Sequence, residues 1–233
     1  MSRLVAVTRY CVEPPDLPAS IRRVGGTKNP DLEAIAALDP DLVLVNREEN
    51  RMVDIEWLSA RFPVLSQGPS TIREAALAVV ELGKRLGARG EAEGIRERIE
   101  CSLALRPAGP RPSVFYAIWR APWMTVTGET YAGDVLREAG ALNVAERMPG
   151  RYPRVPSGML ESLEVDLVLL SSEPYAFGAE HVPEASRCFG PRARVLLCDG
   201  KDFCWHGART PEGLRRARAL LARARSGLDP GAG

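Results

Sequence analysis

Five large aromatic side chains in the C-terminal half of the chain could form one wall of a binding site. They are Trp119, Trp123, Tyr152, Tyr175 and Trp205. Ligand pockets combine apolar and aromatic surface with a few polar groups, so these rings would suit a large planar ligand. Several of them follow short apolar runs and lie near Arg120 and Pro122, which favours a cleft. The alternative is ordinary core packing, where aromatic side chains are common.

Charged side chains near the same runs could anchor polar groups of such a ligand. The candidates are Arg9, Lys28, Glu48, Glu49, Arg51, Arg120, Glu173 and Arg209. Arginine binds carboxylates and phosphates through two parallel hydrogen bonds, and glutamate accepts hydrogen bonds from amides. Two simpler roles stay open: arginines that are only solvated, and glutamates at helix N-termini, where the helix dipole favours negative charge.

His206 could line the same site or coordinate a metal carried by the ligand, because imidazole is a common metal ligand. Its spacing from Cys198 and Cys204 does not match a structural zinc site. The sequence contains no nucleophile elbow, phosphate-binding loop, dinucleotide-binding glycine motif or zinc-protease motif. The two histidines leave few options for nucleophile–histidine–acid chemistry. We therefore expect a binding protein rather than an enzyme, with no catalytic residue, no protein-bound metal and no required cofactor.

Two α/β lobes are predicted to position these residues. A continuous apolar run between turn signals, such as Leu42–Val45, is typical of a strand buried on both faces of a parallel sheet, and Val165–Leu170 is predicted to be a second buried strand. Such runs alternate with short helical segments, which predicts parallel sheets with helices on their faces. Residues 1–69 would form the N-terminal lobe and residues 111–233 the C-terminal lobe.

Residues 70–110 are predicted to be a helical connector between the lobes. In Glu91–Leu105, apolar residues recur at steps of three and four, which is one face of an α-helix. Gly87 and Gly90 are expected to separate this helix from the preceding one, Ile72–Leu86. We expect this long, rigid helix to join the lobes, with a ligand bound in the cleft between them. The alternative is a packed helix inside one large domain.

An internal match favours two related lobes. Leu38–Glu48 aligns with Leu163–Glu173, and in both segments a glutamate follows a buried strand. Open α/β sheets bind ligands at the carboxyl ends of their strands, so Glu48 and Glu173 would face one shared cleft. Short apolar runs also match by chance, which leaves two unrelated strands as the alternative.

Composition excludes several classes of partner. The formal net charge of +1, from 31 basic and 30 acidic residues, gives no electrostatic case for nucleic acid or an anionic membrane surface. No apolar run reaches the roughly 20 residues needed to cross a bilayer. The N-terminus lacks the pattern of a secretion signal, and the five scattered cysteines suit reduced thiols. We expect a cytoplasmic monomer, or a periplasmic protein if the natural N-terminus lies upstream.

Three stretches taken together resemble a known family: Val24–Glu33, Pro40–Val45 and Asn46–Arg51. They look like the class III substrate-binding proteins of ABC importers, also called helical-backbone metal receptors. The resemblance covers nearly the whole chain, including Trp119–Trp123 and Glu173–Tyr175, and is closest to the cobalamin-binding branch. In that family a rigid helix joins two α/β lobes, and a metal chelate binds between them.

The resemblance implies non-catalytic binding of a metal chelate, with a cobalt corrinoid as the first candidate. The chain would serve as the substrate-binding component of an ABC importer or as a cytoplasmic relative of one. Family members dock on the permease through one glutamate on each lobe. Glu33 matches the first position, whereas Gly158 stands at the second and Glu161 follows one turn later. Members usually begin with a strand and a helix upstream of the position that matches Arg3, and this sequence starts after them.

Three other functions stay open. The ligand could be haem or an iron siderophore. The cleft could belong to an enzyme that acts on a tetrapyrrole-like substrate, with Glu48, Glu173 or His206 as acid or base. The chain could also be a scaffold or sensor that binds its partner without ligand.

Overall fold

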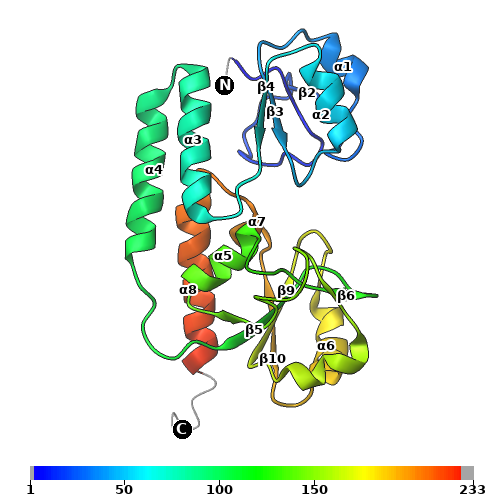
Figure 1. Cartoon of the computed structure of the whole chain (residues 1–233), viewed down its shortest axis with the longest axis vertical. Coiled ribbons are helices and arrows are strands. Elements are labelled where there is room, and N and C mark those ends of the chain that lie inside the picture. Colours follow the sequence, from blue (N-terminus) through cyan, green and yellow to red (C-terminus); the bar gives the residue numbers. More distant parts are fainter. Residues whose placement is uncertain (1–2, 227–233) are drawn as a thin grey trace. The chain divides into compact units, whose positions relative to one another are not determined.

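The computed structural model describes residues 3–226. Contacts within the chain divide it into two compact units, unit 1 (Met1–Gly68) and unit 2 (Pro69–Gly233). Both units are mixed α/β structures whose main strand pairings are parallel, which confirms the predicted fold class (Figure 1). The helical segment 70–110 is grouped with unit 2 by its contacts. No helix in the described part of the chain is long and apolar enough to cross a membrane.

In its described residues, from Arg3 onward, unit 1 has two separate parallel strand pairs and two helices. Its elements are β1 (Ala6–Val7), β2 (Arg22–Arg23), α1 (Leu32–Ala36), β3 (Val43–Asn46), α2 (Met52–Ser59) and β4 (Val64–Gln67). β1 pairs with β2, and β3 pairs with β4. Val45, Ile55 and Leu58 form its small core, with Leu32 of α1 packed against them.

The prediction that Leu42–Val45 is buried on both faces is wrong. Leu44 is 53% exposed, whereas Val45 is buried. Successive side chains of a strand point to opposite faces of the sheet. The core of unit 1 takes Val45 from one face of β3, and Leu44 on the other face remains open to solvent.

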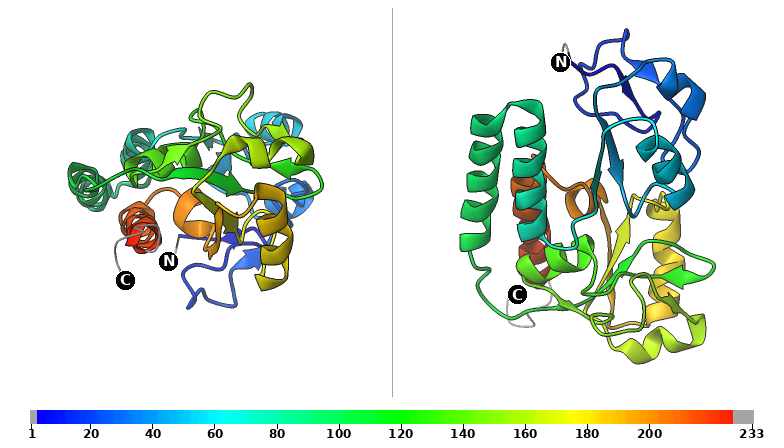
Figure 2. Two further views of the ribbon diagram at one scale, coloured as in Figure 1. Left: turned by 90° about the horizontal axis from the view of Figure 1, so that it is seen from below. Right: turned by 45° about the horizontal axis from the view of Figure 1, so that its top comes forward.

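Unit 2 is built on a four-stranded parallel sheet with helices on both faces (Figures 1 and 2). The strands lie in the order β10 (Arg194–Cys198), β9 (Leu167–Ser171), β5 (Ser113–Ala117) and β7 (Leu142–Asn143). A short antiparallel ribbon joins β6 (Trp123–Met124) and β8 (Arg154–Val155). The α-helices are α3 (Ile72–Leu86), α4 (Arg89–Ala104), α5 (Tyr131–Glu138), α6 (Val182–Phe189), α7 (Lys201–Cys204) and α8 (Thr210–Ser226). Up to residue 226, the unit also has the 3-10 turns η1 (Ser157–Met159), η2 (Glu161–Leu163) and η3 (Ala179–His181).

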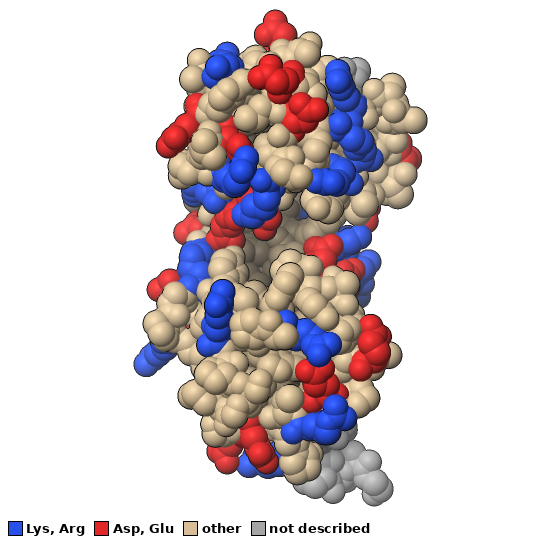
Figure 3. Space-filling view, turned by 90° about the vertical axis from the view of Figure 1, so that its right-hand side faces the viewer, with Lys and Arg blue, Asp and Glu red and all other residues tan. Residues whose placement is uncertain are grey.

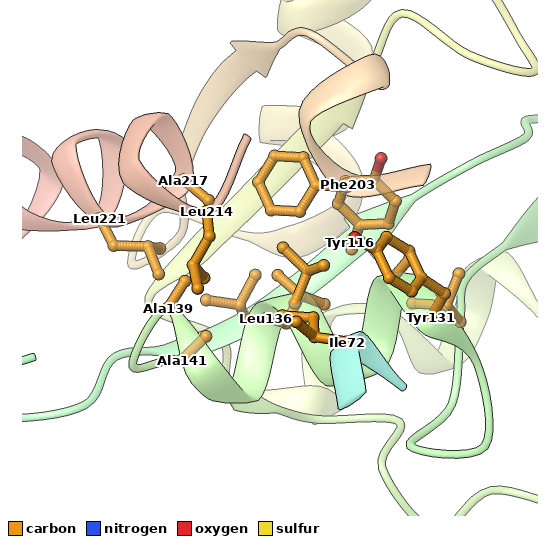
Figure 4. Packing of buried hydrophobic residues seen from close by; sticks show 14 of the residues in the cluster. Ile72, Tyr116, Tyr131, Leu136, Ala139, Ala141, Phe203, Leu214, Ala217 and Leu221 are labelled. Carbon is orange, nitrogen blue, oxygen red and sulfur yellow. The ribbon is translucent and has the colours of Figure 1, made fainter. Parts of the chain in front are cut away.

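Unit 2 has two hydrophobic cores, one on each face of its sheet, and successive side chains of the central strands pack into them alternately. On β5, Tyr116 enters the core made with α3, α5 and α8, whereas Phe115 enters the core made with α6. Figure 4 shows side chains of the first core, among them Tyr116 of β5, Leu136 of α5 and Leu214 of α8. β9 is fully buried along Leu167–Ser171, so the prediction of a strand buried on both faces is confirmed in this unit.

The connector segment folds as a helical hairpin. α3 ends at Gly87, which adopts a left-handed conformation with φ of 65°, and α4 returns beside α3 (Figure 1). The two helices approach closely at Gly83, where an added Cβ would lie 2.3 Å from the Cβ of Ala92. Gly87 thus breaks the helix as predicted. Gly90 does not, because it lies in the first turn of α4.

Arg218 on α8 ties the ends of two other helices together. Its guanidinium group donates hydrogen bonds to the main-chain oxygens of Ser102 in α4, at 2.7 Å, and of Glu138 in α5, at 3.2 Å. The last carbonyl groups of a helix have no partner within the helix, so a cation at this position satisfies them. Partial burial lowers the pKa of Arg218 from its ordinary value.

We expect Arg218→Met to destabilise unit 2 by about 2 kcal/mol, because the carbonyl oxygens lose their donor while the aliphatic stem is kept. Arg215→Met is the matched control on the same helix, since Arg215 makes an exposed pair with Glu212. Its loss should shift the unfolding midpoint much less than Arg218→Met does, because exposed ion pairs contribute little to stability. Urea unfolding followed by circular dichroism measures both variants, and equal unfolding midpoints would contradict the role of Arg218.

Glu212 in the first turn of α8 accepts hydrogen bonds from Arg215 and Arg216 at 2.6 to 2.7 Å. These bonds lower its pKa from the ordinary 4.5 to about 2. A pKa that is lower in the folded state stabilises the fold above the unfolded pKa, and this gain is lost as the pH falls through the folded pKa. We therefore expect the free-energy difference between wild type and Glu212→Gln to be constant near neutral pH and to shrink between 4.5 and about 2. Urea titrations at a series of pH values measure it, and a difference that does not change with pH would refute this expectation.

Candidate functional site

The loops after β5, β9 and β10 leave the sheet of unit 2 at one edge, because the three strands are parallel neighbours. This carboxyl edge is where open α/β sheets bind ligands. It carries Trp119 after β5, Glu173 and Tyr175 after β9, and Trp205 after β10. The topology therefore collects residues that are far apart in the sequence.

Glu173 and Trp205 are joined directly. The indole Nε1 of Trp205 donates a hydrogen bond to Glu173 Oε2 at 2.8 Å, and Cys204 Sγ lies 3.5 Å from the same oxygen. The ammonium group of Lys201 lies 5.1 Å from the centre of the Trp205 ring. The short helix α7 positions these groups, and it begins next to Gly200, where an added Cβ would lie 2.6 Å from Ser171 Oγ.

Trp119 and Tyr175 form an aromatic pair at the same edge. Their ring centres lie 5.4 Å apart at an angle of 73°. Trp119 is 42% exposed, and a bridge to Met124 turns the chain back directly after it. Tyr175 packs on Phe177 at 4.6 Å. The pair therefore presents a supported but accessible aromatic surface.

Trp123 does not belong to an accessible aromatic wall, contrary to the prediction. It is only 2% exposed, stacks on Phe177 at 5.9 Å and meets Phe189 edge-on at 5.6 Å. Pairing of β6 with β8 places this indole in the core between the sheet and α6. The simpler alternative, core packing, holds at this position.

Arg120 and Arg209 are engaged by carboxylates of their own unit. Arg120 pairs with Glu184 at 2.8 Å. Arg209 donates to Asp199 at 3.4 Å and to Asp202 at 3.0 Å. Burial and the neighbouring Asp199 raise the pKa of Asp202, and Arg209 opposes this rise. Both arginines, which we expected to face a ligand, are held in ion pairs that fasten the loops of the edge.

His206 packs against the core side of the same loop. Its ring meets Tyr131 edge-on at 5.8 Å, and the Tyr131 hydroxyl bonds to Thr210 at 2.8 Å. Within residues 3–226, no group of three or more His, Cys, Asp or Glu side chains is placed to hold a metal ion. Tyr152 is exposed in the loop before β8.

Unit 1 brings together three of its predicted binding residues. Lys28 Nζ donates to the main-chain oxygen of Glu48 at 2.7 Å, and Arg9 donates to Asn29 Oδ1 at 2.9 Å. These contacts join the loops that follow β1, β2 and β3. Two cationic groups therefore lie at the carboxyl ends of the strands of unit 1.

Arg51 and Glu49 stand apart from this group. Arg51 makes two hydrogen bonds of 2.7 Å to the buried Asp54, which hold the first turn of α2. Two of its guanidinium nitrogens, Nε and Nη2, are therefore engaged with the helix. Glu49 is exposed in the same loop.

The two predicted docking glutamates are accessible. Glu33 lies on α1 of unit 1 and Glu161 in η2 of unit 2, and both are exposed. Neither forms an ion pair with another residue in the range that the structure describes. On the face drawn in Figure 3, basic and acidic side chains are interspersed over each unit, in keeping with the net charge of +1.

Two residues of this cluster were not predicted from the sequence. Lys201 lies against the Trp205 ring, and Cys204 lies next to the Glu173 carboxylate. The signal that could have found them is their position, because they follow β10 as the other candidates follow β5 and β9. The amphipathic pattern does not mark them, since α7 is a single short turn.

Known proteins are similar to this chain in sequence and in fold. A family model described as periplasmic binding protein matches residues 2–185. The vitamin B12-binding protein of Photorhabdus laumondii is 23% identical over 211 residues, which cover 88% of this chain and 74% of that protein. The vitamin B12-binding protein of Vibrio vulnificus is 23% identical over 195 residues, which cover 81% of this chain and 68% of that protein.

Solved structures agree in fold. The periplasmic vitamin B12 binding protein BtuF of Vibrio cholerae superposes with a TM-score of 0.79 at 18% identity, covering 95% of this chain and 89% of that one. A periplasmic haem-binding protein from Pseudomonas aeruginosa gives 0.78 at 22% identity, covering 93% and 84%. The resemblance found in the sequence is thus confirmed, and because the family model spans most of the residues, this chain belongs to the periplasmic binding protein family.

Proposed function

We propose that the chain binds a metal-chelate small molecule, with a corrinoid as the first candidate ligand. It would act as the substrate-binding component of an ABC importer or as a relative of one. The observation that carries this proposal is the accessible aromatic and carboxylate cluster at the carboxyl edge of unit 2. There the Trp119–Tyr175 pair and the Glu173–Trp205 hydrogen bond lie on adjacent loops.

The chemistry of the cluster suits a flat macrocycle with polar side arms. Trp119 and Trp205 offer ring surfaces, which gain energy by covering apolar area. Glu173 uses Oε2 for Trp205, and its Oε1 has no hydrogen-bond partner among residues 3–226, so it can accept from a ligand amide. In unit 1, Lys28 and Arg9 supply cationic groups for carbonyl or carboxylate oxygens. None of these contacts breaks or forms a covalent bond in the ligand.

Docking on a permease is part of the same proposal. Exposed glutamates of the two units, Glu33 and Glu161, are available for arginines of a partner. Such pairs guide orientation and association rate more than they add affinity. A double variant, Glu33→Gln with Glu161→Gln, should bind ligand as wild type does and lose stimulation of the transporter ATPase.

Haem is the second candidate ligand. It is favoured by the solved haem-binding proteins that share the fold, among them one whose structure holds two haems. Haem is also flat, and its carboxylates would suit Lys28 and Arg9 in unit 1.

Calorimetric titration of the full chain separates these possibilities. Hydroxocobalamin, cobinamide, haemin and a ferric siderophore are each titrated under one set of conditions, with the absorbance spectrum recorded in parallel. We expect saturable one-to-one binding of a corrinoid. Tighter binding of haemin would assign the second candidate, and no saturable binding by any of the four would reject the proposal.

A further inference from the structure

His181 connects the main chain of one loop to the hydroxyl group of Tyr175. The imidazole is largely buried, with 8% of the residue exposed. Its Nδ1 lies 2.9 Å from the main-chain nitrogen of Gly178, and its Nε2 lies 3.1 Å from Tyr175 Oη. The ring also packs edge-on against Tyr175 and Phe177, at 5.4 Å in each case.

The direction of this hydrogen-bond relay follows from its first member. A main-chain N–H can only donate, so Nδ1 of His181 must accept from Gly178 and carry no proton. In a neutral imidazole the proton is then on Nε2, which donates to Tyr175 Oη. The tyrosine hydroxyl is thus used as an acceptor on this side, and its own proton points elsewhere.

The alternative, a proton on Nδ1 of His181 that pairs with Glu180, is less favourable. Glu180 Oε1 lies 3.4 Å from Nδ1 and could pair with a protonated ring. Its side chain is 71% exposed, however, and exposed pairs contribute little to stability. A proton on Nδ1 would also confront the N–H of Gly178, which would then lose its acceptor inside the unit.

We propose that Tyr175 Oη is a donor subsite that selects an oxygen acceptor on the ligand, either a carbonyl or a carboxylate oxygen. His181 is the positioning residue that sets this polarity. The inference rests on the proposed function, because the ligand is the partner of the free hydroxyl proton. Within residues 3–226, Tyr175 Oη makes no hydrogen bond other than the one to His181, so its proton is available.

The surroundings hold the hydroxyl in place. The Tyr175 ring contacts Trp119 and Phe177, with ring centres 5.4 and 4.6 Å away, and it lies in the same loop as Glu173. Glu173 Oε1 offers an acceptor and Tyr175 a donor, two residues apart. A ligand side arm with an amide group presents both complements, an N–H and a C=O.

Nuclear magnetic resonance tests the polarity without any ligand. In the ¹⁵N-labelled full chain near neutral pH, we expect the His181 ring to show a protonated Nε2 and an unprotonated Nδ1. In Tyr175→Phe the tautomer should persist, since Gly178 still donates to Nδ1. A proton on Nδ1, alone or in a doubly protonated ring, would overturn the inference whether or not a ligand binds.

Titration tests the subsite. Hydroxocobalamin carries amide carbonyl oxygens and haemin carries carboxylates, so the wild type is titrated with both. We expect Tyr175→Phe, which keeps the ring packing, to lose about tenfold in affinity, the scale of one buried hydrogen bond. Tyr10→Phe in unit 1 is the control and should bind as wild type does. Binding by wild type with unchanged affinity in Tyr175→Phe would overturn the inference alone, whereas no binding by wild type would overturn the proposed function.

Discussion

Gly133→Ala is expected to destabilise unit 2 by about 3 kcal/mol or more, or to prevent its folding. Gly133 lies in the first turn of α5, where an added Cβ would sit 2.1 Å from the main-chain oxygen of Thr127 and 2.9 Å from its carbonyl carbon. These are backbone atoms, so they cannot rotate away as a flexible side chain can. The methyl group would push α5, with its buried Val135 and Leu136, away from the sheet.

Gly94→Ala is the matched control, because it makes the same chemical change inside another helix of unit 2. An added Cβ at Gly94 meets only Arg98 Nη1, at 3.8 Å. Alanine is the better helix former by about 1 kcal/mol, so this variant should gain stability. Urea unfolding measures the change in the free energy of unfolding, which should fall in Gly133→Ala and rise in Gly94→Ala. A change in the same direction for both variants would contradict the packing described for α5.

Removing the accessible indoles is the second change with a large expected effect. If a planar chelate lies against the carboxyl edge of unit 2, Trp119→Ala and Trp205→Ala should each weaken its binding by about 30-fold, or about 2 kcal/mol. Each truncation removes a broad apolar ring that the structure leaves partly exposed. Calorimetric titration with hydroxocobalamin measures the loss.

Leu142→Ala supplies the comparison for these variants. Leu142 is also an exposed large apolar residue of unit 2, but it pairs with Ser113 at the start of β5, at the opposite end of that strand. Its loss should leave affinity unchanged. A similar loss in Leu142→Ala, or a change of less than about threefold in both tryptophan variants, would show that the carboxyl edge does not bind the ligand.

The class of fold could be predicted from hydrophobic runs and turn residues, because these report local structure. What they could not report is the number of neighbours a strand acquires. Leu42–Val45 and Leu167–Leu170 have the same apolar pattern, yet Leu44 is exposed in unit 1 while Leu169 is buried between β5 and β10. Burial on the second face depends on segments far away in the sequence, so the pattern of either run could not decide it.

The candidate site shows the same limit at the level of single residues. Trp119 and Trp123 lie four positions apart after one strand, and the sequence treats them alike. The bridge of Trp119 to Met124 and the pairing of β6 with β8 send one indole outward and the other into the core. The carboxylates that occupy Arg120 and Arg209 also come from other elements, α6 and α7 with its preceding loop. The place of a residue after a strand therefore predicts that it lies at the carboxyl edge of the sheet. It does not predict whether the side chain is accessible.

Hydrogen exchange measured by mass spectrometry tests the location of the ligand most directly. The full chain is compared with and without saturating hydroxocobalamin. We expect slower exchange in the loops after β9 and β10 of unit 2 and after β3 of unit 1, with little change in the hairpin of α3 and α4. Unchanged exchange in all three loops at saturation, or protection confined to other surfaces, would contradict it.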